Sequence, residues 1–320
     1  MSRTRFSTLK DLLGEDYVEP GTPLCAGCGA IIALRLFHKA LGGRVVWVNA
    51  AGCITLLIVY PFTPLKSSWM YTAMASAPAG AQGIRDALDI LIEKERIPVE
   101  EDLKVVVVTG DGAASDIGLQ STSGAIHRGL DFYYLCYDNE AFGNTGFQYS
   151  AATPYGSRTA TSPPTPLIPE GYRGRKKDLF EIWRAHKPPY VATVSPSHPM
   201  DMIRKIEKAE KYKGPKLFIS ISPCPPGWII ETMDTVKLAK LAVETGIWPL
   251  KEAVYGEVHH TYIPRRLKPV EEYLKIQGRF KHLFYPVRRD DVIAKIQREI
   301  EEYWRIVYDK ELGKEDSGLT

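Results

Sequence analysis

The sequence predicts an α/β fold in which a parallel sheet is flanked by helices. Short apolar runs rich in β-branched residues alternate along the chain with longer segments whose apolar side chains recur at helical spacing. Such continuous apolar runs are typical of strands that are buried on both faces, as in parallel sheets. Glycine-rich and polar clusters follow the runs directly, and open α/β sheets bind their ligands at the carboxyl ends of the strands.

Each element of this fold can be assigned to a segment of the chain. The predicted strands lie at 44–49, 103–109, 132–137, 190–194 and 216–222. The predicted helices between them lie at 31–41, 79–95, 119–129 and 200–212. The stretch at about 155–177 is rich in Pro, Gly, Ser, Thr and basic residues and is predicted to be a long loop.

The pattern changes near residue 233. We expect a helix at 235–245, an irregular segment through residue 269 and a long helix at 290–312. The apolar stripe of the last helix faces either the core or a partner subunit. The chain is therefore divided into an α/β domain, 1–232, and a mostly helical C-terminal extension, 233–320, that packs on it and on partner subunits.

Length and composition exclude several classes of protein. The chain has 320 residues, of which 44% are hydrophobic and 25% charged, and its net charge of +3 argues against a dedicated nucleic-acid binder. No apolar run reaches the roughly 20 residues that a membrane-spanning helix needs. The N-terminal segment carries acidic residues and lacks the apolar centre of a signal peptide. We expect a cytoplasmic protein that binds neither nucleic acid nor membrane.

A glycine turn around one acid, Gly110-Asp111-Gly112, follows the strand predicted at 103–109. Glycine lets the backbone approach a phosphate closely, and carboxylate oxygen is a ligand that Mg²⁺ prefers. Asn139 follows the next strand, so one helical crossover places it beside Asp111, with the Ala141 carbonyl as a third candidate ligand. The turn alone is equally consistent with a tight strand–helix connection. Together with the spaced Asn139, it resembles the signature of thiamine-diphosphate (TPP) enzymes.

Five cysteines in a chain without a signal peptide argue against a disulfide framework. Cys25 and Cys28 form a CxxC pair on a glycine-rich loop, which suits a redox pair, half of a zinc knuckle or ligands of an iron–sulfur cluster. Cys53 and Cys224 each follow a predicted strand, so four thiolates on one rim favour a 4Fe–4S cluster, with zinc as the alternative. Cys136 lies inside a predicted strand and is expected in the core.

Eight motifs in order give the chain its strongest resemblance to a known family. They are CAGCG at 25–29, GC at 52–53, GDG at 110–112, DIGLQ at 116–120, YDNEA at 137–141, NTG at 144–146, ATPYG at 152–156 and CPPGW at 224–228. The chain resembles the β, TPP-binding subunit of the pyruvate:ferredoxin and 2-oxoacid:acceptor oxidoreductases over roughly residues 20–285. The resemblance implies the TPP-binding fold.

The resemblance also implies a role for each matching residue. Cys25, Cys28, Cys53 and Cys224 would ligate the 4Fe–4S cluster. Asp111, Asn139 and the Ala141 carbonyl would hold Mg²⁺, and Asn144 would be catalytic, beside the thiazolium and the substrate. The cofactor-binding set would be Gly29, Gly52, Gly110, Asp111, Gly112, Ala113, Asn139, Ala141, Asn144 and Thr145.

The family's activity implies partners and a reaction. The expected reaction is the oxidative decarboxylation of a 2-oxo acid to acyl-CoA and CO₂, with electrons passed to ferredoxin or another acceptor. Pyruvate is favoured, but Ala51 and Gly143 depart from the family pattern and keep branched-chain acids and aromatic acids such as phenylglyoxylate open. In the family a glutamate from the α subunit activates TPP, so α, γ and ferredoxin-like δ subunits, or fused equivalents, are expected.

Two other functions and one surface feature are also considered. A non-redox TPP-dependent decarboxylase or synthase would need no cysteine cluster. A zinc-stabilised, non-catalytic subunit would bind zinc and no TPP. The basic run of Arg173, Arg175, Lys176 and Lys177 is expected to be a solvated surface, with a contact to a partner or to coenzyme A phosphates as the alternative.

Overall fold

One mixed sheet forms the centre of the molecule. The computed structural model describes residues 6–59, 61 and 63–311. The sheet has eight strands in the order β2-β1-β3-β4-β6-β5-β7-β8, and the strands from β2 to β5 run parallel whereas β7 and β8 are antiparallel. Their bounds are β1 Val45–Ala50, β2 Ser68–Thr72, β3 Lys104–Gly110, β4 Tyr133–Asp138, β5 Tyr190–Val194, β6 Lys216–Ile221, β7 Leu250–Val254 and β8 Glu257–Tyr262.

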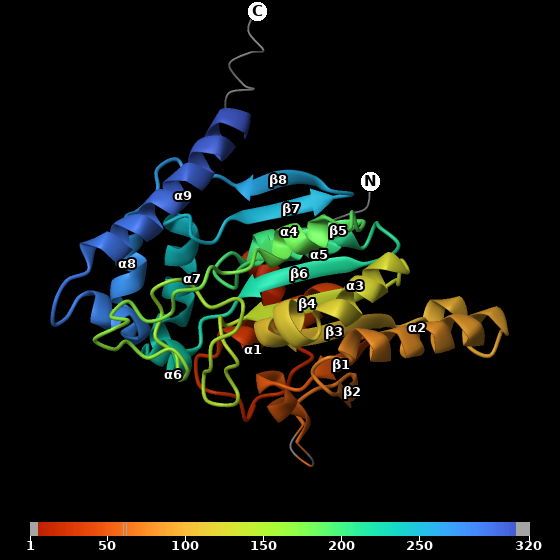
Figure 1. Ribbon diagram of the computed structural model, residues 1–320. Helices are drawn as coiled ribbons and strands as arrows, with labels where there is room; N and C mark the ends of the chain where they lie inside the picture. The colour runs from red at the N-terminus through yellow and green to blue at the C-terminus, as the bar shows by residue number, and fades with distance from the viewer. Residues whose placement is uncertain (1–5, 60, 62, 312–320) are drawn as a thin grey trace, which may run out of the picture.

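Helices cover both faces of this sheet (Figure 1). Helices α1 (Gly29–Leu41) and α5 (Pro199–Ala209) pack together on one face. Helices α2 (Ala77–Glu93), α3 (Leu119–His127) and α4 (Leu179–Arg184) cover the other. Strand β3 is apolar throughout because both of its faces are buried. Val106 and Val108 belong to the core under α1 and α5, and Val105 and Val107 belong to the core under α2 and α3.

The C-terminal helices gather at one end of the sheet, at the left of Figure 1. They are α6 (Pro225–Trp228), α7 (Thr235–Glu244), α8 (Val270–Lys275) and α9 (Asp290–Glu311). The apolar stripe of α9 is buried at Ile293, Ile296, Ile300, Trp304 and Val307, which confirms that it faces the core. Short 3-10 segments lie at Leu9–Leu13, Cys53–Ile58, Val99–Glu101, Thr232–Asp234 and Gly278–Leu283, and a π-helical turn at Ala113–Ile117.

The structure confirms the α/β class and the helical C-terminal segment, and it corrects one detail. The segment predicted to be irregular before residue 269 contains the hairpin of β7 and β8, which extends the sheet beyond β5. The edge strand β2 also escaped prediction, because its five residues are largely exposed and carry no apolar run. The division at residues 232 and 233 stays a prediction. Within the described part of the chain, no helix has the length and apolar character to cross a membrane.

Candidate functional site

The Gly-Asp-Gly turn lies where a strand becomes a helix. Strand β3 ends at Gly110, helical structure begins at Asp111, and one π-helical turn precedes α3. Such turns occur often at functional sites, and the free N–H groups of a helix start favour anions. A Cβ atom on Gly112 would lie 2.3 Å from the Phe142 ring, so only glycine fits there.

Three oxygen atoms converge beside this turn. Strands β3 and β4 are parallel neighbours, with Gly110 opposite Tyr137, so Asp111 and Asn139 leave the sheet side by side, as predicted. The Asn139 side-chain oxygen faces Asp111 Oδ1 at 2.9 Å and the Ala141 carbonyl oxygen at 2.8 Å, and turning the amide over would make both contacts hydrogen bonds. In an octahedral Mg²⁺ site with bonds of about 2.1 Å, adjacent oxygens are likewise about 2.9 Å apart. The donor set therefore fits Mg²⁺.

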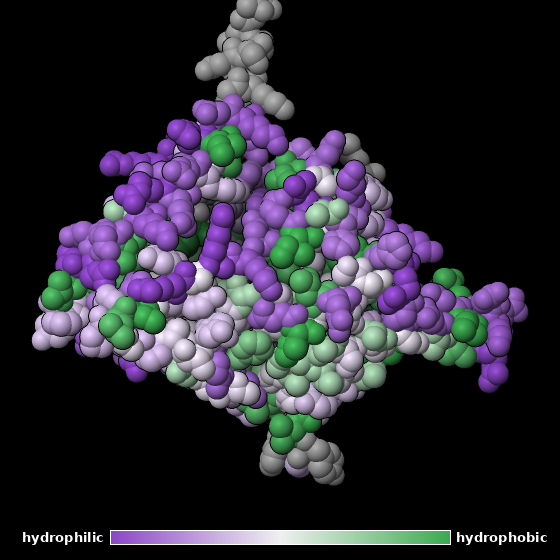
Figure 2. Space-filling model, in the orientation of Figure 1, coloured by the Kyte–Doolittle hydropathy of each residue, from purple (hydrophilic) through white to green (hydrophobic). Residues whose placement is uncertain are grey.

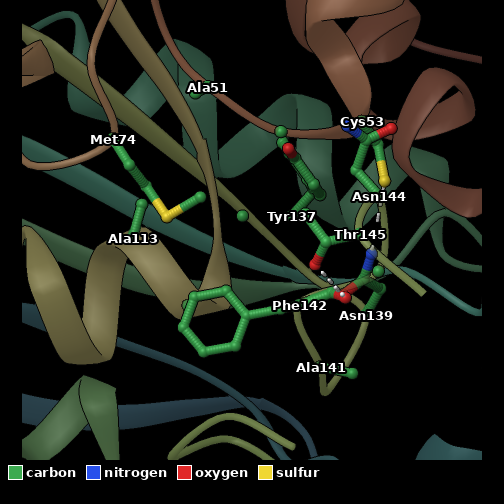
Figure 3. Close-up of a pocket in the computed structure, with 14 residues that line it drawn as sticks. Ala51, Cys53, Met74, Ala113, Tyr137, Asn139, Ala141, Phe142, Asn144 and Thr145 are labelled. Atoms are coloured by element: carbon green, nitrogen blue, oxygen red, sulfur yellow. Dashed lines mark hydrogen bonds between the residues drawn. The ribbon is translucent and has the colours of Figure 1, made fainter. Parts of the chain in front are cut away.

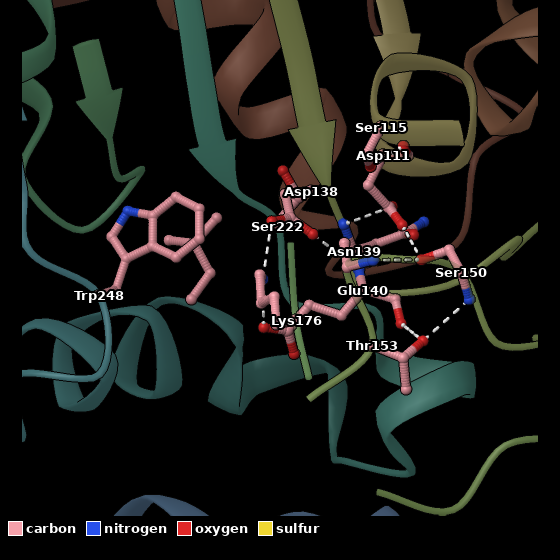
Figure 4. Close-up of polar contacts among 12 residues, drawn as sticks. Asp111, Ser115, Asp138, Asn139, Glu140, Ser150, Thr153, Lys176, Ser222 and Trp248 are labelled. Carbon is pink, nitrogen blue, oxygen red and sulfur yellow. Dashed lines mark hydrogen bonds and ion pairs between the residues drawn. The ribbon is translucent and has the colours of Figure 1, made fainter. Parts of the chain in front are cut away.

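The surroundings of the Asp111 carboxylate are suited to a bound cation. Its side chain is 1% exposed, and it accepts hydrogen bonds from Ser150 Oγ at 2.5 Å and from the Asn139 N–H at 3.2 Å (Figure 4). Burial raises the pKa of Asp111 well above its usual value, and the charge of Asp138 raises it further. A cation bound to its free edge would reverse this shift.

A small pocket of about 110 Å³ opens beside the three oxygens (Figure 3). It is lined by every predicted cofactor-binding residue except Gly29 and Asp111, and also by Cys53. Met74, Tyr137 and Phe142 line it as well. Sequence reasoning missed these three because nothing in an apolar or aromatic residue marks it as a cofactor contact. Asn144 and Thr145 are exposed at its edge, where a second subunit can reach them.

The CxxC loop is held against the segments on either side of α6. A Cβ atom on Gly29 would lie 2.8 Å from Pro223 N, and the Gly29 N–H donates to the Pro223 carbonyl at 3.1 Å. A Cβ atom on Gly27, at φ +70°, would lie only 2.3 Å from the Thr232 carbonyl oxygen. These glycines let the loop carrying Cys28 lie next to the strand end that carries Cys224. Gly29 thus packs on the chain itself, and its cofactor contact stays a prediction.

The four predicted ligand thiols influence one another electrostatically. Burial raises the pKa of Cys53 to about 12, and the charges of Cys224, Cys28 and Cys25 add to it. Burial likewise raises the pKa of Cys224 to about 11, with contributions from Cys28 and Cys25. Across the described residues, however, no three His, Cys, Asp or Glu side chains are arranged to hold a metal. Cys136 is fully buried in β4, which confirms its predicted place in the core.

One member of the basic run is not a solvated surface residue. Lys176 Nζ lies 2.8 Å from both Asp138 Oδ2 and Glu140 Oε1, and Arg279 Nη2 lies 2.6 Å from Glu140 Oε2. The expectation of a solvated surface is therefore wrong for Lys176. Sequence reasoning also missed Arg279 and Ser150, because their contacts join segments that are distant along the chain.

The fold and the site define a thiamine-diphosphate enzyme. Residues 50–220 match the family described as "Thiamine pyrophosphate enzyme, C-terminal TPP binding domain". More narrowly, the chain belongs to the family of β subunits of the 2-oxoacid:ferredoxin oxidoreductases, an enzyme family that oxidises 2-oxo acids. It is 42% identical to pyruvate synthase subunit PorB of Methanocaldococcus jannaschii over 92% of this chain and 97% of that one. It is 39% identical to ketoisovalerate oxidoreductase subunit VorB of Pyrococcus horikoshii over 89% of this chain and 91% of that one.

A solved structure supports the fold independently. It is 2-oxoglutarate:ferredoxin oxidoreductase from Magnetococcus marinus with 2-oxoglutarate, coenzyme A and succinyl-CoA bound. The two chains superimpose with a TM-score of 0.54 and 20% sequence identity, over 75% of this chain and 82% of that one.

Proposed function

We propose that this chain is the TPP- and cluster-binding subunit of a coenzyme A-dependent oxidoreductase whose substrate is pyruvate. In this proposal Asp111, Asn139 and the Ala141 carbonyl hold Mg²⁺ on the diphosphate of TPP. Cys25, Cys28, Cys53 and Cys224 hold one 4Fe–4S cluster. The observation that carries the proposal is the Asn139 side-chain oxygen, which lies 2.9 Å from Asp111 Oδ1 and 2.8 Å from the Ala141 carbonyl oxygen, beside a pocket that Cys53 also lines.

The chain's own residues divide the work of this site. The backbone around Gly110, Gly112 and Ala113 lines the pocket beside the helix start, so it faces the diphosphate. Bound TPP supplies the electron sink for decarboxylation of the 2-oxo acid. Asn144 lies at the exposed edge of the pocket, where it would contact the substrate side of bound TPP.

The position of Cys53 supports a cluster close to the cofactor. Its Sγ lies 4.0 Å from Asn139 Nδ2, so a proposed cluster ligand and a proposed metal ligand lie side by side in the same pocket. Electrons leaving the substrate then have a short path to the cluster. A non-redox TPP enzyme has no use for this contact.

Several features support partner subunits. The described residues that line the pocket include no carboxylate, so the acid that activates TPP comes from another chain, the α subunit. The edge strand β2 exposes Met70 and Tyr71, and apolar side chains gather on the lower part of the face in Figure 2, whereas hydrophilic ones predominate over α9. We place the α subunit against this face, with γ and ferredoxin-like δ subunits completing the complex. Its cytoplasmic location stays a prediction.

Pyruvate is the substrate that the relatives favour. Several relatives are pyruvate synthase subunits and another is a ketoisovalerate oxidoreductase subunit, so a branched-chain acid is the second candidate. Ferredoxin is proposed as the electron acceptor, as in the 2-oxoglutarate:ferredoxin oxidoreductase of similar fold.

The test is anaerobic spectroscopy of the complex purified with its partner subunits. Iron, acid-labile sulfide, zinc and TPP are quantified first. Electron paramagnetic resonance (EPR) and visible spectra are then recorded after coenzyme A and either pyruvate, 2-oxoisovalerate or phenylglyoxylate are added. One TPP per copy of this chain, four irons per copy beyond those of the ferredoxin-like subunit, and cluster reduction by pyruvate are the expected results. Zinc in place of those four irons would overturn the cluster, and TPP without them would leave a non-redox decarboxylase.

A further inference from the structure

The turn that carries the proposed metal ligands has an unusual backbone. Between Asn139 and Ala141, Glu140 adopts a left-handed conformation at φ 65°, which non-glycine residues rarely do. A conformation of this kind persists only where the surroundings fix it. Because Glu140 separates two of the three ligands, its conformation decides whether their oxygens meet at Asp111.

Every polar group of Glu140 is held by a partner. Its N–H donates to Asp138 Oδ1 at 3.0 Å, and its carbonyl accepts from Thr153 Oγ1 at 2.7 Å. Its two carboxylate oxygens accept separately, one from Lys176 Nζ at 2.8 Å and one from Arg279 Nη2 at 2.6 Å. The two cations come from the long loop and from the segment Gly278–Leu283, so two segments that are distant along the chain hold the turn (Figure 4 shows Lys176).

Arg279 is held rigidly in the core, next to Glu140. It is fully buried, its Nε donates to Gln277 Oε1 at 2.8 Å, and its guanidinium lies 3.8 Å above the Trp228 ring.

Trp228 connects the same arginine to both halves of the site. Its indole Nε1 donates to the Asn139 carbonyl at 2.9 Å, and its backbone N–H donates to the Cys224 carbonyl at 2.7 Å. Arg279 therefore touches the metal-binding turn twice, through Glu140 on one side and through Trp228 on the other.

We propose that Arg279, together with Lys176, is a positioning residue for the metal. By holding the Glu140 carboxylate and the Trp228 ring, Arg279 keeps the turn in the conformation that brings the Asn139 and Ala141 oxygens to Asp111. The C-terminal segment thereby sets the affinity of the site for the divalent cation and TPP. This inference rests on the proposed function, because it concerns the same Mg²⁺–TPP site.

The test measures metal binding rather than activity. The complex with its partner subunits is stripped of metal and TPP, and Mn²⁺ is titrated with saturating TPP while the EPR signal of free Mn²⁺ is followed at room temperature. We expect Arg279→Met to weaken Mn²⁺ binding at least tenfold. Arg279→Lys retains the charge but not the forked set of N–H donors, so we expect it to lower Mn²⁺ affinity less than Arg279→Met does. Wild-type affinity in a folded Arg279→Met complex overturns the inference.

Two further variants separate positioning from stability. Lys205→Met removes another buried cation, which lies 2.7 Å from Asp201 on α5, and is expected to lower the unfolding temperature with Mn²⁺ affinity within twofold of wild type. If Arg279→Met does not fold, the double variant Glu140→Gln/Arg279→Met removes both charges of the pair, and the same tenfold loss is expected. A folded double variant with wild-type affinity overturns the inference. If the wild-type complex itself binds no Mn²⁺ with TPP, the proposed function fails, which is a different result.

Discussion

The two halves of the candidate site are built in different ways. The oxygen half is buried, with Asp111 1% and Asn139 5% exposed, and the Asn139 oxygen already lies 2.9 Å from Asp111 Oδ1 and 2.8 Å from the Ala141 carbonyl oxygen. In the cysteine half, Cys25 is exposed and the other three thiols are partly exposed. No three of these thiols are arranged as ligands in the described structure. One half is preformed by the fold, whereas the other is only brought together on one rim.

The origin of the side chains explains this difference. Asp111 and Asn139 follow neighbouring parallel strands whose hydrogen-bonded register fixes their separation. The thiols come from a loop, a 3-10 segment and the residue before α6, and the hydrogen bond of Gly29 with Pro223 joins the first of these to the last. In the proposed function, binding of the cluster would release the thiol protons and supply the remaining order. A substitution in one half is therefore expected to leave the other half intact.

The largest effect is expected from Asp111→Asn. An amide there removes the charge that a divalent cation needs, so TPP and Mg²⁺ binding should fall at least a hundredfold and activity with them. Iron and sulfide content should stay at the wild-type level. The control is Asp131→Asn, at the opposite end of the sheet, where the carboxylate contacts the Gly214 N–H and Lys216. Loss of iron in Asp111→Asn would show that the halves depend on each other.

The converse change is Cys53→Ser. Loss of one thiolate should remove the cluster and lower oxidation of the 2-oxo acid roughly a hundredfold, while TPP content stays unchanged. The matched control is Cys136→Ala, which alters a thiol buried in β4 and should retain full iron content. Unchanged iron and sulfide in Cys53→Ser would remove this residue from the ligand set.

The sequence was sufficient for the parts of the site that the sheet determines. Asp111 and Asn139 were predictable as neighbours because parallel strands and one crossover leave little freedom in where their ends lie. The cysteines were predictable as a set because each precedes or follows a recognisable element. The metal or cluster that these cysteines bind was not predictable, because a shared rim does not define the geometry of the ligands.

Other contacts were beyond sequence reasoning. Lys176 looked like part of a solvated basic run, yet the fold of the long loop turns it toward two buried acids. Arg279 lies far along the chain from Glu140, and only tertiary packing joins them. The β7–β8 hairpin left a weak signal at Tyr255-Gly256, where both residues have positive φ. Asn-Gly or Asp-Gly would have marked this turn more clearly.

Acid should weaken the cysteine half through α1, the helix that follows Cys28. His38 on α1 is fully buried against Trp47, its Nε2 lies 2.8 Å from Ser67 Oγ, and burial lowers its pKa from 6.5 to about 4. The unfolded state therefore binds the proton more readily, so stability is complete above pH 6.5 and falls as the pH drops toward 4, by at most roughly 3 kcal/mol.

Hydrogen exchange in the complex measures this effect locally. Protection of the α1 amides, corrected for intrinsic exchange rates, should fall between pH 7 and pH 5 more than protection of α3. His38→Gln, which retains a polar contact to Ser67 without a titrating ring, should flatten this dependence. Equal losses in α1 and α3 would contradict the assignment to His38.

The smallest effect is expected where the two halves touch, at Gly143. A Cβ atom there would lie 2.7 Å from Asn139 Nδ2 and 3.5 Å from Cys53 Sγ, so Gly143→Ala must displace Asn139 by a few tenths of an ångström. We expect TPP and Mn²⁺ affinity to fall several-fold, about 1 kcal/mol, with iron content unchanged. Gly83→Ala on α2, where a Cβ would meet nothing within 4 Å, is the control and should leave affinity as it is. Because the displaced atom belongs to the preformed half, wild-type affinity in Gly143→Ala would mean that this half adjusts after all, and that its oxygen spacing is set by the cation rather than by the fold.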